Sequence, residues 1–162
     1  MRSFITLALI LTSLFSFSQS VVGKWKPVFF TMDTLMRADV KADTFFINKA
    51  MMTENFKNDK DPEFSMQMME MLFKGLFRNL KEVEEEYFED GSYKETNMKA
   101  KKMKTGKWVY DEKENILTKT ISPATEAQHF SVRWSNGQLV LTTELGSGSD
   151  KKGNLEIIYE KI

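Results

Sequence analysis

The stretch that decides the fold is Val83 to Met98, with the sequence VEEEYFEDGSYKETNM. Its residues alternate with the period of two that is typical of a β-strand, and Asp90-Gly91 interrupts the alternation. Because Asp-Gly tolerates the positive φ angles of a two-residue hairpin loop, we predict a strand on each side of it. This register places Phe88 opposite Tyr93 as an aromatic pair across the two strands.

Short alternating segments separated by turn residues continue to the end of the chain, and Asn136-Gly137 gives a second hairpin signal. Upstream, Trp25, Pro27 and Phe29 share one side of a first predicted strand, in which the proline indicates an edge or a bulge. The eight predicted strands cover residues 24–31, 83–89, 92–98, 104–110, 115–121, 128–134, 138–144 and 154–161.

Eight antiparallel strands joined by short turns predict a closed up-and-down β-barrel, wide enough for its own side chains or for one small ligand. The alternative is an open sheet with a helix packed across one face. We favour closure because only the first strand carries an edge marker such as proline.

A helical insertion is predicted between the first and second strands, over residues 62–81. Asp61 is a favourable N-cap, Pro62 suits the first helical position and Glu63 lies in the first turn. Apolar residues then recur at steps of three and four. They are Met66, Met69, Phe73, Phe77 and Leu80. The sequence leaves open whether this helix covers the barrel mouth, fills it or packs outside.

Residues 32–61 are less informative. Asp43-Thr44 could cap a short helix over Phe45 to Phe56, or the segment could form an irregular lid.

The N-terminus predicts export. Arg2 precedes an uncharged apolar run from Phe4 to Phe17, which is shorter than the roughly twenty residues that cross a bilayer. Ser16-Phe17-Ser18 suits signal peptidase, so we expect residues 1–18 to be a signal peptide and residues 19–162 to be one periplasmic or secreted domain. An uncleaved anchor or a buried helix is the alternative. The chain has no cysteine, which excludes disulfides and attachment of a lipid through cysteine.

The composition narrows the expected partners. With 23 basic and 23 acidic residues the chain lacks the excess of positive charge that binding to nucleic acid requires. No second apolar segment could span a membrane. The 13 Phe and 11 Met supply more large apolar surface than a barrel core of this size needs.

No catalytic constellation is visible, and we expect neither enzymatic activity nor a cofactor. His129 is the only histidine and has no cysteine or carboxylate at ligand spacing, so a structural role is expected. Four methionines of the predicted helix could bind Cu(I) through their thioethers, but at helical spacing they divide into two stripes. Apolar packing is the favoured interpretation of this set, which is Met66, Met68, Met69 and Met71.

The charged runs Glu82 to Glu86 and Lys99 to Lys107 are expected to be solvated faces that attract each other across neighbouring strands.

Four motifs follow one another along the chain: Gly23-Lys24-Trp25, Phe88 to Tyr93, Gly106-Lys107-Trp108 and Leu139-Val140-Leu141. In this order they resemble bacterial exported lipocalin-like domains. The resemblance implies a lipocalin-like barrel in which Trp25 closes one end. It also implies that Lys161 stands where such domains carry an arginine over this tryptophan.

We therefore expect a non-catalytic binding protein for a small apolar ligand of the lipid or fatty-acid class, held at the barrel mouth. The expected contacts are Phe29, Met69, Phe73, Phe77, Tyr93 and Trp134. The alternative is a protein-interaction or structural domain of the cell envelope with a filled barrel, and Cu(I) binding is a lesser one.

Overall fold

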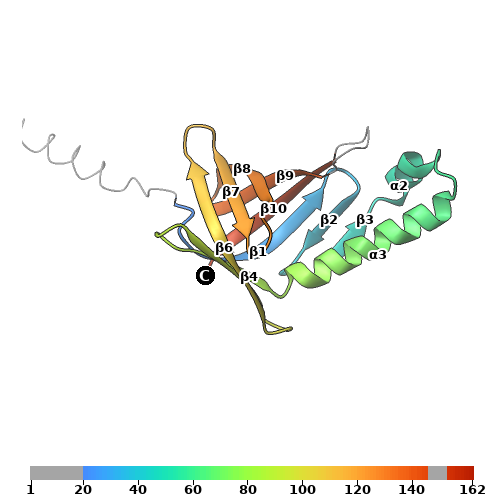
Figure 1. The fold of residues 1–162 in the computed structure, drawn as a ribbon. Helices are drawn as coiled ribbons and strands as arrows, with labels where there is room; N and C mark the ends of the chain where they lie inside the picture. The colour runs from blue at the N-terminus through green and yellow to red at the C-terminus, as the bar shows by residue number, and fades with distance from the viewer. Residues whose placement is uncertain (1–19, 146–152) are drawn as a thin grey trace, which may run out of the picture.

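The alternating segments form an antiparallel ring in which each strand pairs with the next, and the last strand returns to pair with the first. The eight-stranded barrel is therefore closed, as predicted (Figure 1). The structure is a computed structural model that describes residues 20–145 and 153–162, so the expected signal peptide lies outside it. The barrel strands are β1 (Gly23–Met32), β4 (Val83–Tyr87), β5 (Ser92–Asn97), β6 (Lys102–Asp111), β7 (Ile116–Ile121), β8 (Ala127–Ser135), β9 (Gln138–Leu145) and β10 (Gly153–Lys161).

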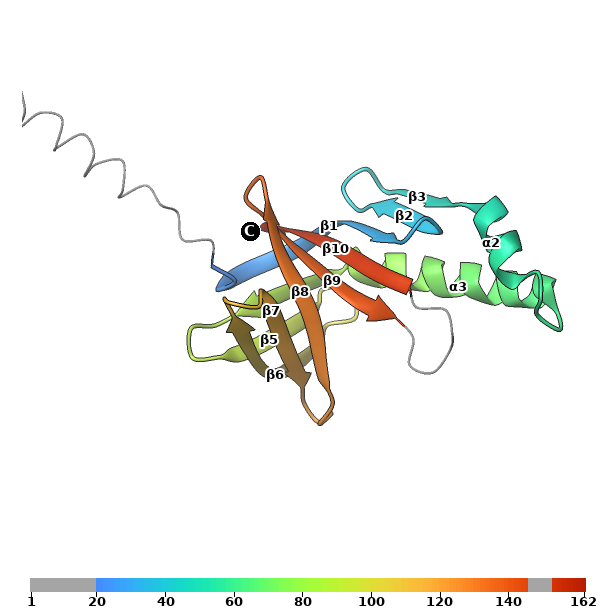
Figure 2. The ribbon, with the colours of Figure 1, turned by 90° about the horizontal axis from the view of Figure 1, so that it is seen from above.

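Strand β1 belongs to the barrel and to an extension of its sheet. Residues Gly23 to Trp25 pair with β4, whereas Phe29 to Met32 pair with the insertion. The insertion consists of β2 (Met36–Asp39), β3 (Thr44–Ile47), α2 (Lys49–Phe56) and α3 (Pro62–Leu80). Figures 1 and 2 show these elements together on one side of the barrel.

The predicted helix over residues 45–56 is wrong in its first part. Phe45 and Phe46 lie in β3, where they pair with β2 in a hairpin, and the helix α2 begins only at Lys49. Asn48 caps it by accepting a hydrogen bond from the Met51 amide, in place of the predicted Asp43-Thr44 cap. Pairing with β2, which in turn pairs with β1, decides the conformation of these aromatic residues, which favour strands.

A β-bulge corrects the predicted orientation of the first strand. The pairing of β1 with β10 shifts between Pro27 and Phe29, so the alternation changes phase there. Trp25 and Phe30 are consequently buried, whereas Phe29 is only partly buried. The proline predicted this irregularity, but not its effect on which phenylalanine faces the core.

The register of the β4–β5 hairpin also differs from the prediction by one residue. Tyr87, not Phe88, pairs with Tyr93, and their rings lie 5.1 Å apart. The reason is the loop, in which the Phe88 amide donates to the Ser92 carbonyl and only Gly91 has a positive φ. A loop of three residues therefore replaces the expected two-residue turn. The Asn136-Gly137 turn has positive φ at both residues, as predicted.

Helix α3 has the predicted start, because Asp61 accepts from the Phe64 amide at 3.0 Å. Its inner face buries Phe73 and places the ring of Phe77 5.6 Å from Phe45 and 6.2 Å from Phe30. Phe30 pairs with Ile157 and thus lies on the inner face of the sheet. The helix therefore covers this face where the sheet extends past the barrel, and only its C-terminal end reaches the barrel mouth.

The opposite end of the barrel is closed by tryptophans. Trp25 is buried, its Nε1 donates to the Val21 carbonyl at 2.8 Å, and its ring lies 5.9 Å from that of Trp134. The Lys161 ammonium lies 5.5 Å from the Trp25 ring and donates to the Val22 carbonyl. Trp25 and Lys161 thus occupy the packing positions that the sequence motifs imply.

Candidate functional site

The interior of the barrel contains a buried ion pair, and the alternation of strand residues explains why. In β4, Val83, Glu85 and Tyr87 share one face, which is buried, while the glutamates between them point outward. In β7, Lys119 shares the inner face with Leu117. The side chains of Glu85 and Lys119 expose only 6% and 5% of their surface.

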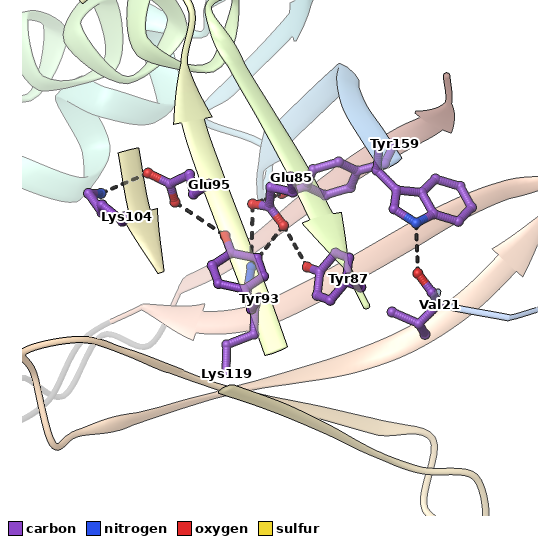
Figure 3. Close-up of polar contacts among 9 residues, drawn as sticks. Val21, Glu85, Tyr87, Tyr93, Glu95, Lys104, Lys119 and Tyr159 are labelled. Atoms are coloured by element: carbon purple, nitrogen blue, oxygen red, sulfur yellow. Dashed lines mark hydrogen bonds and ion pairs between the residues drawn. The ribbon is translucent and has the colours of Figure 1, made fainter. Parts of the chain in front are cut away.

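The Glu85 carboxylate is saturated with donors (Figure 3). Its Oε2 accepts from the Tyr87 hydroxyl at 2.5 Å and from Lys119 Nζ at 3.1 Å. Its Oε1 accepts from the Tyr159 hydroxyl at 3.0 Å, with Lys119 Nζ at 3.4 Å. Burying a charge is costly unless it is paired and hydrogen-bonded, and this arrangement meets both conditions.

The Lys119 ammonium is enclosed by aromatic rings on its other sides. It lies 4.5 Å from the ring centre of Phe130, 5.2 Å from that of Tyr93 and 5.9 Å from that of Tyr87. Ring faces carry partial negative charge and attract a desolvated cation. Because rings occupy its other sides, Lys119 makes an ion pair with one carboxylate in the described part of the chain, that of Glu85.

A second ion pair lies nearer the mouth. Glu95 faces Glu85 across the β4–β5 ladder, which would be unfavourable for two unpaired carboxylates. Lys104 pairs with Glu95 at 2.8 Å, just as Lys119 pairs with Glu85. The Tyr93 hydroxyl also donates to Glu95, at 3.3 Å. Glu85 and Glu95 thus each have their own lysine.

Burial and nearby carboxylates keep three tyrosines of the site protonated. Desolvation is the main cause that raises the pKa of Tyr87 and Tyr159 well above the usual value, and the adjacent Glu85 raises it further. Desolvation also raises the pKa of Tyr93, with contributions from Glu85 and Glu95. These hydroxyls therefore act as hydrogen-bond donors to the carboxylates.

A cavity of about 800 Å3 lies above this polar cluster. Its lining combines the two ion pairs and Tyr159 with apolar side chains from four strands and from the end of α3. The apolar part comprises Leu80, Val83, Ile116, Phe130, Leu155 and Ile157. The exposed residues Lys104, Gln128 and Glu144 also line it, so the cavity is open to solvent at this end of the barrel.

The six residues predicted to contact a ligand do not line this cavity. Tyr93 comes closest, since it is buried beside Lys119. Trp134 lies at the closed end, and Phe29 is turned away from the interior by the bulge. The three predicted helix contacts pack against the core of the insertion; they are Met69, Phe73 and Phe77.

Sequence reasoning missed Glu85 because it treated the run Glu82 to Glu86 as a solvated face, and it did not consider Lys119, which lies outside both charged runs. The alternation of the strands contained the signal: Glu85 lies between Val83 and Tyr87, and Lys119 lies two residues after Leu117. The outward residues Glu84 and Glu86 do not pair with the run Lys99 to Lys107, because their partners are Lys24 at 2.6 Å and Lys94 at 3.6 Å.

The residues considered for metal binding do not come together. Met66 and Met69 pack against the core, whereas Met68 and Met71 expose 39% and 60% of their surface on the other side of α3. Within residues 20–145 and 153–162, no group of three or more His, Asp or Glu side chains could hold a metal ion. His129 is exposed and contacts the Thr118 hydroxyl at 3.1 Å through Nδ1.

The fold and the site define a closed eight-stranded antiparallel β-barrel with an internal cavity. No known family model matches the chain, and no curated protein matches it significantly. Among solved structures it is similar to the crystal structure of a DUF4847 family protein from Bacteroides vulgatus ATCC 8482. The identity is 14%, the TM-score is 0.39, and the match covers 83% of this chain and 91% of the other. A likeness of this size carries no argument about function.

No helix in the described part of the chain has the length and apolar character needed to cross a bilayer.

Proposed function

We propose that this chain is an exported, non-catalytic binding protein that holds one small amphipathic molecule of the lipid class in its barrel. The observation that supports this proposal is the cavity of about 800 Å3, with apolar walls and a polar, hydrogen-bonded cluster at its base. Ligand sites typically span roughly 300–1,000 Å3 and combine mainly apolar linings with a few polar groups. The resemblance of the sequence motifs to exported lipocalin-like domains supports the same proposal.

The charges of the site favour a ligand with an uncharged polar head. Lys119 is balanced by Glu85 and Lys104 by Glu95, so a carboxylate would enter beside two glutamates whose lysines are already paired. An ammonium has three donors, and those of Lys119 that do not reach Glu85 face aromatic rings. A neutral polar head, such as an amide or ester, would enter beside the two ion pairs without adding charge.

Binding is tested with the fluorescent apolar probe N-phenyl-1-naphthylamine and two tryptophan variants of β10. Ile157→Trp would fill the cavity, because Ile157 lines it, whereas Ile158→Trp places the same bulk on the other face of the strand. We expect saturable binding by the native chain, a loss of at least tenfold in Ile157→Trp and little change in Ile158→Trp. Absence of binding, or equal binding by both variants, would refute the proposal.

The polarity of the head group is tested by displacing this probe with decanamide and with decanoate at neutral pH. The two compounds share one chain length and differ in charge at the head. We expect decanamide to displace the probe at a concentration at least tenfold lower. Stronger displacement by decanoate would show that a lysine of the site exchanges its glutamate for the ligand, which contradicts the uncharged head.

Export is tested by the mass of the chain recovered from cells. Cleavage before Gln19 would yield a chain that lacks residues 1–18, and recovery of the full chain in the cytoplasm would contradict the proposal.

A second candidate function, protein interaction at the cell envelope, is favoured by one observation, the apolar outer face of α3.

A further inference from the structure

The turn between β5 and β6 concentrates positive charge. Residues Met98 to Met103 have the sequence MKAKKM, and all of them are exposed. We call residues 98–103 the basic tip. It contains three lysines, none of which makes an ion pair with another residue in the ranges 20–145 and 153–162; they are Lys99, Lys101 and Lys102.

The glutamates of β4 and β5 pair with lysines outside the basic tip. The pairs are Glu84 with Lys24, Glu85 with Lys119, Glu86 with Lys94 and Glu95 with Lys104. Glu82 borders the tip, since its carbonyl accepts from the Met98 amide at 2.7 Å, so three lysines stand beside one glutamate there. The whole chain carries 23 basic and 23 acidic residues. This local excess, not the net charge, therefore decides which part of the chain approaches an anionic surface.

Two exposed methionines flank the lysines. Met98 exposes 53% of its surface and Met103 exposes 62%. Met103 pairs with Thr96, and Met98 lies two positions after Thr96, so both side chains lie on the same side of the hairpin. Flexible apolar side chains beside lysines suit the boundary of a bilayer, because a lysine stem packs on apolar groups while its ammonium stays at the level of the head groups.

The basic tip stands beside the open mouth of the barrel. Asn97, just before the tip, donates to the Asn79 side chain at 3.0 Å, and Asn79 lines the cavity. Lys104, just after the tip, lines the cavity together with Glu95. Figure 1 shows this hairpin projecting from the barrel next to the C-terminal end of α3. A surface that binds the tip therefore lies close to the cavity opening.

We infer that the basic tip docks on the surface of an anionic lipid bilayer and holds the barrel mouth against it. Its lysines pair with lipid phosphates, while Met98 and Met103 pack at the boundary between head groups and acyl chains. An apolar molecule then passes between bilayer and cavity with little exposure to water. This inference rests on the proposed function, because docking at the mouth serves a barrel that carries a lipid.

The test measures co-sedimentation of the chain with lipid vesicles. It uses residues 19–162, the form expected after export, since the apolar run from Phe4 to Phe17 would bind lipid by itself. One set of vesicles contains phosphatidylglycerol and phosphatidylcholine in equal parts, and the other contains phosphatidylcholine alone. We expect binding at least tenfold stronger to the anionic set, and we expect it to weaken as salt is added.

Charge variants show whether the basic tip carries this binding. A lysine near an anionic surface strengthens binding by about fivefold. Replacing all three tip lysines by glutamine should therefore weaken binding to the anionic vesicles at least tenfold. The matched control has the same net charge and should bind as the native chain does, because its three exposed lysines lie in the loop after α2 and in the β6–β7 turn; they are Lys57, Lys60 and Lys113.

A second variant tests the apolar part of the tip. Met98→Ser with Met103→Ser leaves the charge unchanged and should weaken binding at least threefold. Both positions are exposed, so native circular dichroism is expected of this variant and of the charge variants. Binding that the methionine variant leaves unchanged would contradict the contact of these side chains with the bilayer.

Further outcomes separate this inference from the carrier proposal. Ile157→Trp fills the cavity and leaves the tip intact, so it should bind the vesicles as the native chain does. Loss of vesicle binding in Ile157→Trp, or equal binding by the tip variant and its control, would overturn docking through the tip. Binding to soluble heparin without binding to vesicles would also overturn it and would indicate an acidic macromolecule as partner. A native chain that docks through the tip but binds no N-phenyl-1-naphthylamine would refute the carrier proposal and support the docking surface.

Discussion

The buried ion pair makes the sharpest prediction, which concerns the substitution Lys119→Met. Methionine has a similar length and is apolar, so the change leaves the Glu85 carboxylate in the barrel without its cation. Removing one partner of a buried pair typically costs about 3–5 kcal/mol. The hydroxyls of Tyr87 and Tyr159 still donate to the carboxylate, and hydrogen bonds to a charged group contribute roughly 1.5–3 kcal/mol each. We therefore expect the free energy of unfolding to fall by about 3 kcal/mol, at the lower end of this range.

The double substitution Glu85→Gln with Lys119→Met separates charge from packing. It removes both charges, while the glutamine amide can exchange hydrogen bonds with the two tyrosine hydroxyls. Replacing a whole buried pair by neutral groups of similar volume is often neutral or stabilising. We expect the free energy of unfolding of the double variant to differ from that of the native chain by no more than about 1 kcal/mol, even though the double variant carries one substitution more than Lys119→Met.

Urea unfolding followed by tryptophan fluorescence measures both variants, and thermal unfolding gives an independent readout. A loss of about 3 kcal/mol corresponds to a fall in Tm of roughly 6–12 °C for a domain of this size. Equal stability of the single and double variants would show that solvent reaches the pair through the open mouth. The assumption that Glu85 is desolvated would then be wrong.

Three further predictions test other parts of the fold. Alkaline titration followed at 295 nm should show the buried tyrosines ionising together with unfolding above about pH 10. The pKa of Tyr87, Tyr93 and Tyr159 is raised in the folded chain above its unfolded value, so the stability that these tyrosines contribute is present below about pH 10 and is lost as the pH rises. Ionisation of these tyrosines before the chain unfolds would contradict their burial. Phe77→Ala should cost about 2–3 kcal/mol in urea unfolding, because its partly buried ring packs on Phe30 and Phe45; a loss below 1 kcal/mol would show that α3 is not docked. Gly106→Ala should destabilise the barrel by about 1–3 kcal/mol in thermal unfolding, because the added Cβ would collide with the Thr120 carbonyl. The matched control Gly75→Ala should stabilise the helix by up to about 1 kcal/mol, because a Cβ at this position meets no atom within 4 Å.

Local patterns were sufficient for the elements of the barrel. All eight predicted strands, the helix start at Asp61 and the turn at Asn136-Gly137 follow from alternation, capping and turn chemistry. These features depend on neighbours within a few residues of one another. Closure could be predicted too, because eight short antiparallel strands with one marked edge leave few other arrangements.

The residues of the candidate site could not all be predicted in the same way. Because of the bulge after Pro27, Phe30 rather than Phe29 faces the core. The three-residue loop at Gly91 shifts the β4–β5 register by one residue from the predicted register. A shift of one residue sends every later side chain to the opposite face of its strand. These shifts misplaced Phe29 and the inner face of β4, whereas Trp134 and the three helix residues lie outside the cavity because they pack at the closed end and in the insertion.

By itself, the sequence determined the eight barrel strands, the helix over residues 62–81 and their order, because each of these depends on local periodicity and turn geometry. Only the tertiary structure decided that Glu85 meets Lys119, 34 positions away, and that Phe45 joins a strand rather than a helix. The physical reason is that a charge is held inside a barrel only when distant strands bring its partner to it. No pattern along one strand specifies that meeting.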